Sequence, residues 1–95
     1  MMIATVVLTL ADGTIVFNSQ MTAGPEEDKD RLINSVNIMI DLVEATDEIH
    51  ADGNTNLLAT VVAEIPGVFR RDIELFSPNV IAAMIESEMH IEQRR

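Results

Sequence analysis

A short polar segment near the middle of the chain is the first place to look for metal chemistry. Glu48, His50 and Asp52 alternate there and Gly53 follows. This spacing is similar to the first half of a calcium-binding loop, which carries ligands at positions 1, 3 and 5 and glycine at position 6. The twelfth position is Ala59 instead of a chelating glutamate, and His50 stands where calcium requires an oxygen ligand. We therefore interpret the segment as the polar turn that ends a helix, and we predict no metal site.

Residues with catalytic potential are few. His50 and His90 are far apart in the sequence, and Lys29, the only lysine, lies in a charged segment that does not suit Schiff-base chemistry. The chain has no cysteine, which excludes disulfide bonds, thiol catalysis and cysteine-ligated metals. It also lacks a phosphate-binding loop, a dinucleotide fingerprint and a nucleophile elbow. We predict that the protein is not an enzyme and binds no cofactor.

The charge balance excludes further classes of partner. Sixteen acidic and six basic residues give the 95-residue chain a formal net charge of −10, which repels the phosphates of nucleic acids and of anionic membranes. The chain also has no Trp or Tyr to stack on bases. We predict no direct nucleic-acid binding and no membrane binding, and we expect a single cytoplasmic domain over residues 1–95.

A row of acidic side chains is the strongest candidate for a binding site. The polar ridge of a helix between residues 27 and 48 would carry five carboxylates: Glu27, Asp30, Asp41, Glu44 and Glu48. At about 1.5 Å per residue this ridge is roughly 32 Å long, so it can imitate a phosphate backbone and bind the basic surface of a nucleic-acid-binding protein. Glu44, Asp47 and Glu48 also crowd the C-terminal end of the helix, where the helix dipole disfavours them, and this indicates a use for the charge. The alternative is a solvated helix face that keeps the protein soluble.

A long helix from about Pro25 to Glu48 must position this ridge. Its predicted buried side consists of apolar residues at helical spacing: Leu32, Ile33, Val36, Met39, Ile40 and Val43. Ile38 and Leu42 extend the apolar arc to more than half of the circumference. A helix of this kind is buried on two sides, so we predict that Ile38 and Leu42 form the interface of a homodimer.

The first twenty residues predict a β-hairpin. Apolar residues alternate along residues 5–10, and Asp12-Gly13 is a preferred pair for a two-residue type I′ turn. Such a turn pairs Leu10 with Ile15 and Leu8 with Phe17, and it places all four side chains on one face of the hairpin.

Residues 55–76 fit two alternatives. The apolar residues between Leu57 and Ile65 have helical spacing, and residues 68–76 fit a short helix, so we favour helices here. The alternative is a second hairpin, which needs a three-residue loop to keep apolar residues on one face. A repeated Ala-Thr-Val-Val, at residues 4–7 and 59–62, supports that alternative. In both cases Ser77 and Pro78 are expected to begin a final helix.

The sequence therefore predicts an α+β fold in which an N-terminal β-hairpin packs on a long central helix and further C-terminal helices. The alternative fold is ββαββα, with a four-stranded antiparallel sheet. In composition the chain resembles the small, acidic, cysteine-free accessory proteins of bacteriophages and mobile elements, and this resemblance covers no motif. The leading hypothesis for function is a homodimeric interaction protein that inhibits or modulates a partner by binding its basic surface. The alternative is a self-assembling structural subunit.

Overall fold

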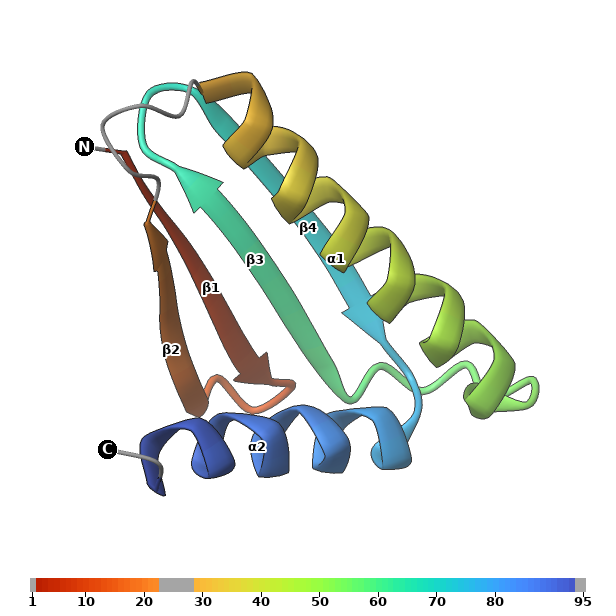
Figure 1. Cartoon of the computed structure of the whole chain (residues 1–95). Helices are drawn as coiled ribbons and strands as arrows, with labels where there is room; N and C mark the ends of the chain where they lie inside the picture. The colour runs from red at the N-terminus through yellow and green to blue at the C-terminus, as the bar shows by residue number, and fades with distance from the viewer. Residues whose placement is uncertain (1, 23–28, 94–95) are drawn as a thin grey trace.

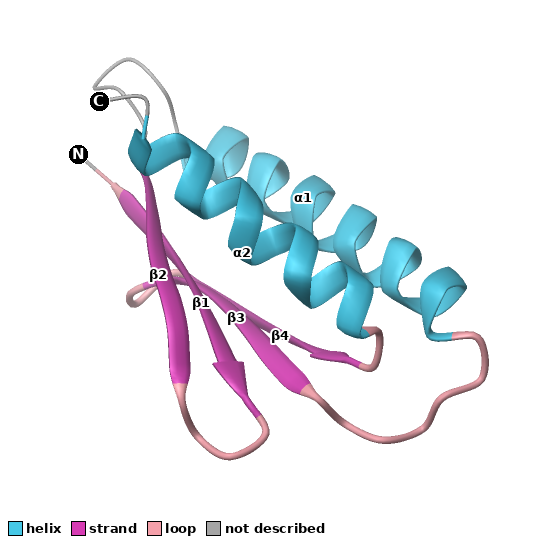
Figure 2. Cartoon of the chain, turned by 90° about the horizontal axis from the view of Figure 1, so that it is seen from below, coloured by secondary structure: helices cyan, strands magenta, loops and turns pink. Residues whose placement is uncertain are grey.

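The computed structural model describes residues 2–22 and 29–93. The elements follow one another as β1 (Ile3–Leu10), β2 (Ile15–Thr22), α1 (Lys29–Ala51), β3 (Ala59–Ile65), β4 (Phe69–Leu75) and α2 (Pro78–Gln93). The four strands form one antiparallel sheet in the order β2-β1-β3-β4, and both helices lie on the same face of it (Figures 1 and 2). The predicted α+β class is confirmed, with the four-stranded sheet of the alternative.

The helices favoured for residues 55–76 are wrong, because these residues form β3 and β4. Val61 and Ile65 are four residues apart, a spacing that places two side chains on one face of a helix and also on one face of a strand. Ala59 and Ala63 decide between the two structures, since a helix would leave them outside the core whereas both are fully buried in β3. Pairing with β1 also satisfies backbone groups that β1 would otherwise expose at an edge.

The second hairpin closes through three residues, as the strand alternative required. Ile65 lies opposite Phe69, so that Val61 faces Ile73 and the buried side chains stay on one face. The turn is closed by the N–H of Val68, which donates to the carbonyl of Ile65 at 2.9 Å. Gly67 in this turn has a φ of 75°, a conformation that side chains with a Cβ rarely adopt.

The first hairpin forms as predicted, but its turn differs. Leu8 lies opposite Phe17, whereas the register shifts by one residue beyond Leu8, so that Ile15 lies opposite Thr9 instead of Leu10. Gly13 has a φ of 94°, and its N–H donates to the Leu10 carbonyl at 2.9 Å. Ala11, Asp12 and Gly13 therefore form a three-residue loop that ends in glycine. The predicted type I′ turn does not form, since it needs a positive φ at both central residues and Asp12 does not have one.

The repeated Ala-Thr-Val-Val segments occupy equivalent places in the two central strands. In each copy the alanine and the first valine are buried, and the threonine and second valine are half-buried. Val7 and Val62, the last residues of the two copies, lie opposite each other in the β1–β3 pair. The two ββα halves thus meet around this pair.

Each helix covers the edge strand of the other half. Helix α1 contacts β4, and α2 contacts β2. Helix α1 contributes Leu32, Val36 and Ile40 to a core that also contains buried residues of β1, β3, β4 and α2. Neither helix is long and apolar enough, within the described residues, to span a membrane.

The segment between α1 and β3 forms the helix-ending turn expected for it. Asp52 and Gly53 both have positive φ angles, 50° and 81°, after the end of α1 at Ala51. Asn54 then anchors the turn, because its side-chain amide donates to the carbonyl of Phe76 at 2.8 Å. The expected beginning of this helix at Pro25 lies outside the described residues.

Candidate functional site

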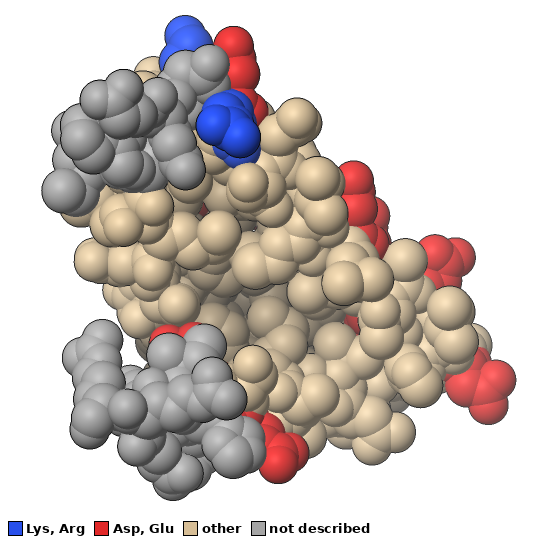
Figure 3. Space-filling view, in the orientation of Figure 1, with Lys and Arg blue, Asp and Glu red and all other residues tan. Residues whose placement is uncertain are grey.

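The acidic ridge lies on the exposed side of α1 that faces the β4 edge of the sheet. Asp30, Asp41, Glu44 and Glu48 are all exposed, and Glu27 lies outside the described residues. In Figure 3, Asp and Glu atoms follow the margin of the molecule along α1, while the centre of the same face is uncharged. The structure thus brings the four described carboxylates to one face of one helix.

Arg71 neutralises the middle of this ridge. It projects from β4, and its guanidinium lies 2.7 Å from the Asp41 carboxylate and 3.5 Å from the Glu44 carboxylate. The same guanidinium donates to the side-chain oxygen of Asn37 at 3.1 Å. Glu48 forms no ion pair with another described residue, so the ridge keeps an unpaired carboxylate toward its C-terminal end.

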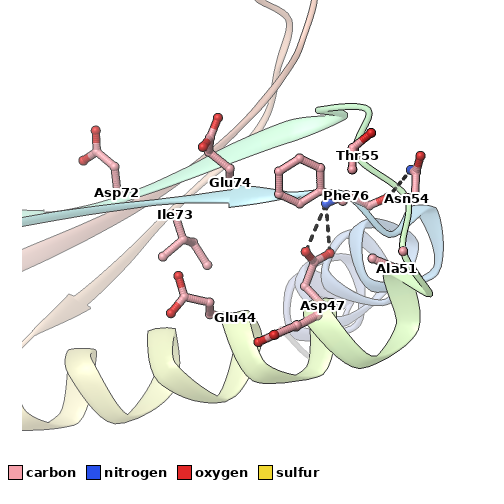
Figure 4. A pocket seen from close by; sticks show the side chains of 11 residues that line it. Glu44, Asp47, Ala51, Asn54, Thr55, Asp72, Ile73, Glu74 and Phe76 are labelled. Atoms are coloured by element: carbon pink, nitrogen blue, oxygen red, sulfur yellow. Dashed lines mark hydrogen bonds between the residues drawn. The ribbon is translucent and has the colours of Figure 1, made fainter.

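A second group of carboxylates, on β4, extends the acidic surface around the sheet edge. Asp72 and Glu74 point to the opposite side of β4 from Ile73 (Figure 4). Together with Glu44 and Glu48 they line an open pocket of about 480 Å³, which we call the acidic pocket. Arg70 pairs with Asp72 at 3.1 Å, and the hydrogen bond that it donates there raises the pKa of the Arg70 guanidinium. Sequence reasoning missed Asp72 and Glu74, because only the packing of β4 against α1 places them at the same pocket as the α1 carboxylates.

Asp47 has a structural role. Its side chain is 3% exposed. Its carboxylate accepts the backbone N–H of Phe76 at 3.0 Å (Figure 4) and the backbone N–H of Ser77 at 2.9 Å. These groups lie at the start of α2, where N–H groups lack helical partners. The helix dipole disfavours Asp47 near the C-terminal end of α1, but its carboxylate is needed at the start of α2. Its position therefore does not indicate a binding partner.

Ile38 and Leu42, the predicted dimer interface, are exposed on α1. Their exposed fractions are 66% and 67%, and Ile49 further along the helix is 75% exposed. With Ala45 these residues follow one another at spacings of four, three and four, so they form one stripe, which we call the apolar stripe. Within the single chain, α1 is thus buried on one side. No described residue buries its second apolar side.

An apolar groove lies beside this stripe, between the two helices. It has a volume of about 590 Å³, and Figure 3 shows the hollow that it forms at the centre of this face. Phe17 and Met21 of β2 form part of its floor, Met39 and Leu42 part of the α1 wall, and Met84 part of the α2 wall. Leu42 belongs to both surfaces, so the stripe and the groove are continuous.

Among the described residues, no three His, Asp or Glu side chains gather closely enough to hold a metal ion. Comparison with known protein families, with curated proteins and with solved structures finds no match for this chain.

Proposed function

We propose that this protein is a cytoplasmic, non-enzymatic interaction module that inhibits or modulates a partner by binding the partner's basic, nucleic-acid-binding surface. The observation that carries the proposal is the acidic surface that runs from Glu48 on α1 to Asp72 and Glu74 on β4 and lines one pocket. Within it, Glu48 and Glu74 have no ion-pair partner among the described residues.

Electrostatics supports this assignment. A chain with a net charge of −10 is attracted over long range to a basic surface, and complementary charge raises the rate of association strongly at low salt. The same surface competes with DNA or RNA for the partner, because both present rows of negative charge.

The test is an affinity capture with charge-matched variants. The tagged chain is incubated with an extract of its source cell, and bound proteins are eluted with rising salt. We expect the wild type to retain a basic nucleic-acid-binding protein that duplex DNA displaces, and we expect Glu48→Lys and Glu74→Lys each to retain less of it.

Glu86→Lys is the matched control, because it makes the same change of charge at an exposed residue of α2 that lines neither the acidic pocket nor the groove. Equal retention by all three variants, or retention that duplex DNA does not reduce, would contradict the proposal.

The apolar stripe favours a second candidate function, self-assembly of the chain as a structural subunit. The expected interface consists of Ile38 and Leu42, whose exposure is high for side chains of their size. Light scattering after size-exclusion chromatography tests this function directly. A dimer that Ile38→Glu converts to a monomer would support it, and a monomeric wild type would remove it.

A further inference from the structure

The apolar stripe and the groove together form a surface larger than either one. Side chains that enter the groove beside Leu42 would also cover Ile38 and Ile49 on the outside of α1, since all three residues lie on one side of the helix. Four of the groove residues are aromatic or methionine side chains: Phe17, Met21, Met39 and Met84. Methionine adapts its shape to an incoming apolar side chain, so this lining suits a protein segment with several apolar anchors.

Carboxylates border this surface on both sides. At about 100° per residue, Asp41 and Glu48 lie beside the stripe, on the side away from the groove. Glu88 of α2 lines the groove and is the only charged residue to do so in the described part of the chain. The one basic residue on the stripe side of α1, Arg31, lies two turns before Ile38, at the end of the stripe. The surface is therefore apolar at its centre and mostly negative at its borders.

This charge pattern favours a basic segment of a partner over a second copy of the chain as the occupant of the surface. A second copy packed through α1 would add another net charge of −10 and the same bordering carboxylates, and like charges across an interface disfavour association. A segment with apolar anchors on one face and Lys or Arg on both flanks would bury the stripe and pair with the borders. An amphipathic helix presents this combination at spacings of three and four residues.

We propose that the stripe and the groove dock an amphipathic, basic helix of the partner protein. The apolar face of the helix enters the groove beside Leu42 and Met84, and its Lys and Arg side chains approach Glu48 and Glu88. This inference rests on the proposed function, because it specifies the kind of basic segment that the acidic protein binds.

The probe is a fluorescent peptide of about 18 residues, or about five helical turns, made of leucine and lysine in an amphipathic helical pattern. A twin peptide carries glutamate in place of lysine. Binding to the full chain is followed by fluorescence anisotropy. We expect the lysine peptide to bind and the glutamate peptide to fail.

The decisive variant is Leu42→Glu, because it separates apolar docking from charge attraction by the sign of its effect. It adds a negative charge, so binding by charge alone would become tighter. Docking in the groove would become about tenfold weaker or more, since a buried leucine contributes about 1.5–3 kcal/mol. Ile15→Glu is the control, because Ile15 is similarly exposed, at 63%, and lies outside the groove lining. Circular dichroism checks that both variants fold.

Each outcome has a separate meaning. Weaker binding by Leu42→Glu with unchanged or tighter binding by Ile15→Glu supports the inference. Tighter or unchanged binding by Leu42→Glu overturns it and leaves the acidic-surface function standing. Failure of the lysine peptide to bind the wild type contradicts both. A wild-type dimer that Leu42→Glu dissociates shows that a second copy occupies the stripe, and it also overturns the inference.

Discussion

The carboxylate of Asp47 accepts the backbone N–H of Ser77 at 2.9 Å, and this contact joins the last turns of α1 to the residue that precedes α2. The Ser77 hydroxyl in turn accepts the N–H of Val80 at 3.3 Å. Asp47 and Ser77 are both buried. The pair thus fixes how the second helix leaves the sheet, and with it one wall of the apolar groove.

Replacing Asp47 tests this junction. In Asp47→Ala the buried N–H of Ser77 and the partly buried N–H of Phe76 lose their acceptor, and we expect the free energy of unfolding to fall by about 1–3 kcal/mol. Asp47→Asn should lose less, because its amide oxygen still accepts. Urea unfolding measures the change, with Glu48→Gln as the neighbouring exposed control, which should stay within about 0.5 kcal/mol of the wild type. Wild-type stability in Asp47→Ala would show that the contact is dispensable.

Replacing Arg71 should uncover the middle of the acidic ridge. Arg71→Met removes the cation that pairs with Asp41 and Glu44, so we expect tighter binding of an oligolysine peptide and a steeper dependence of that binding on salt. The loss of stability should be about 1 kcal/mol or less, because the two carboxylates are exposed. Arg70→Met changes the net charge equally, but Arg70 pairs with Asp72. Because Asp72 belongs to the acidic pocket, Arg70→Met uncovers charge there and not in the ridge. Unchanged binding by Arg71→Met would contradict the prediction.

Gly67 should resist substitution for a purely conformational reason. Its φ is 75°, and an added Cβ would meet no atom within 4 Å. We therefore expect Gly67→Ala to lower the free energy of unfolding by about 1–2 kcal/mol through backbone strain alone. Val68→Ala, in the same turn, is the control with little expected change. The midpoint of thermal unfolding measures the change in both variants. An unchanged midpoint in Gly67→Ala would rule out a strained turn.

Acid should weaken the first hairpin through Asp12. The backbone N–H of Thr14 donates to the Asp12 carboxylate at 2.9 Å, and this hydrogen bond lowers the pKa of Asp12 below its ordinary value. Because the folded-state pKa is the lower one, the stabilisation is present above the unfolded-state pKa and is lost as the pH falls through the folded-state pKa. Carbon-detected NMR titration should give Asp12 a lower midpoint in the folded chain than in urea. The stability difference between wild type and Asp12→Asn should shrink in acid, and equal midpoints would contradict the assignment.

Several features follow from the sequence by itself because they depend on neighbouring residues. The first hairpin follows from alternating side chains and a glycine turn, α1 from apolar residues at helical spacing, and α2 from the cap at Ser77 and Pro78. The exposed carboxylates of α1 and the exposed Ile38 and Leu42 were also identified in this way, since one helix wheel contains them all. Dimerisation through Ile38 and Leu42 stays a prediction.

The tertiary structure decided what depends on distant residues. Residues 59–65 satisfy both helical and strand spacing, and pairing with β1 selects the strand. The packing of α1 along β4 then brings Arg71 against Asp41. It also places Glu74 at the acidic pocket. The buried role of Asp47 and the groove between the helices likewise arise only when α2 packs beside α1. These contacts join residues about 30 positions apart, and local spacing carries no information about which of many such pairs will meet.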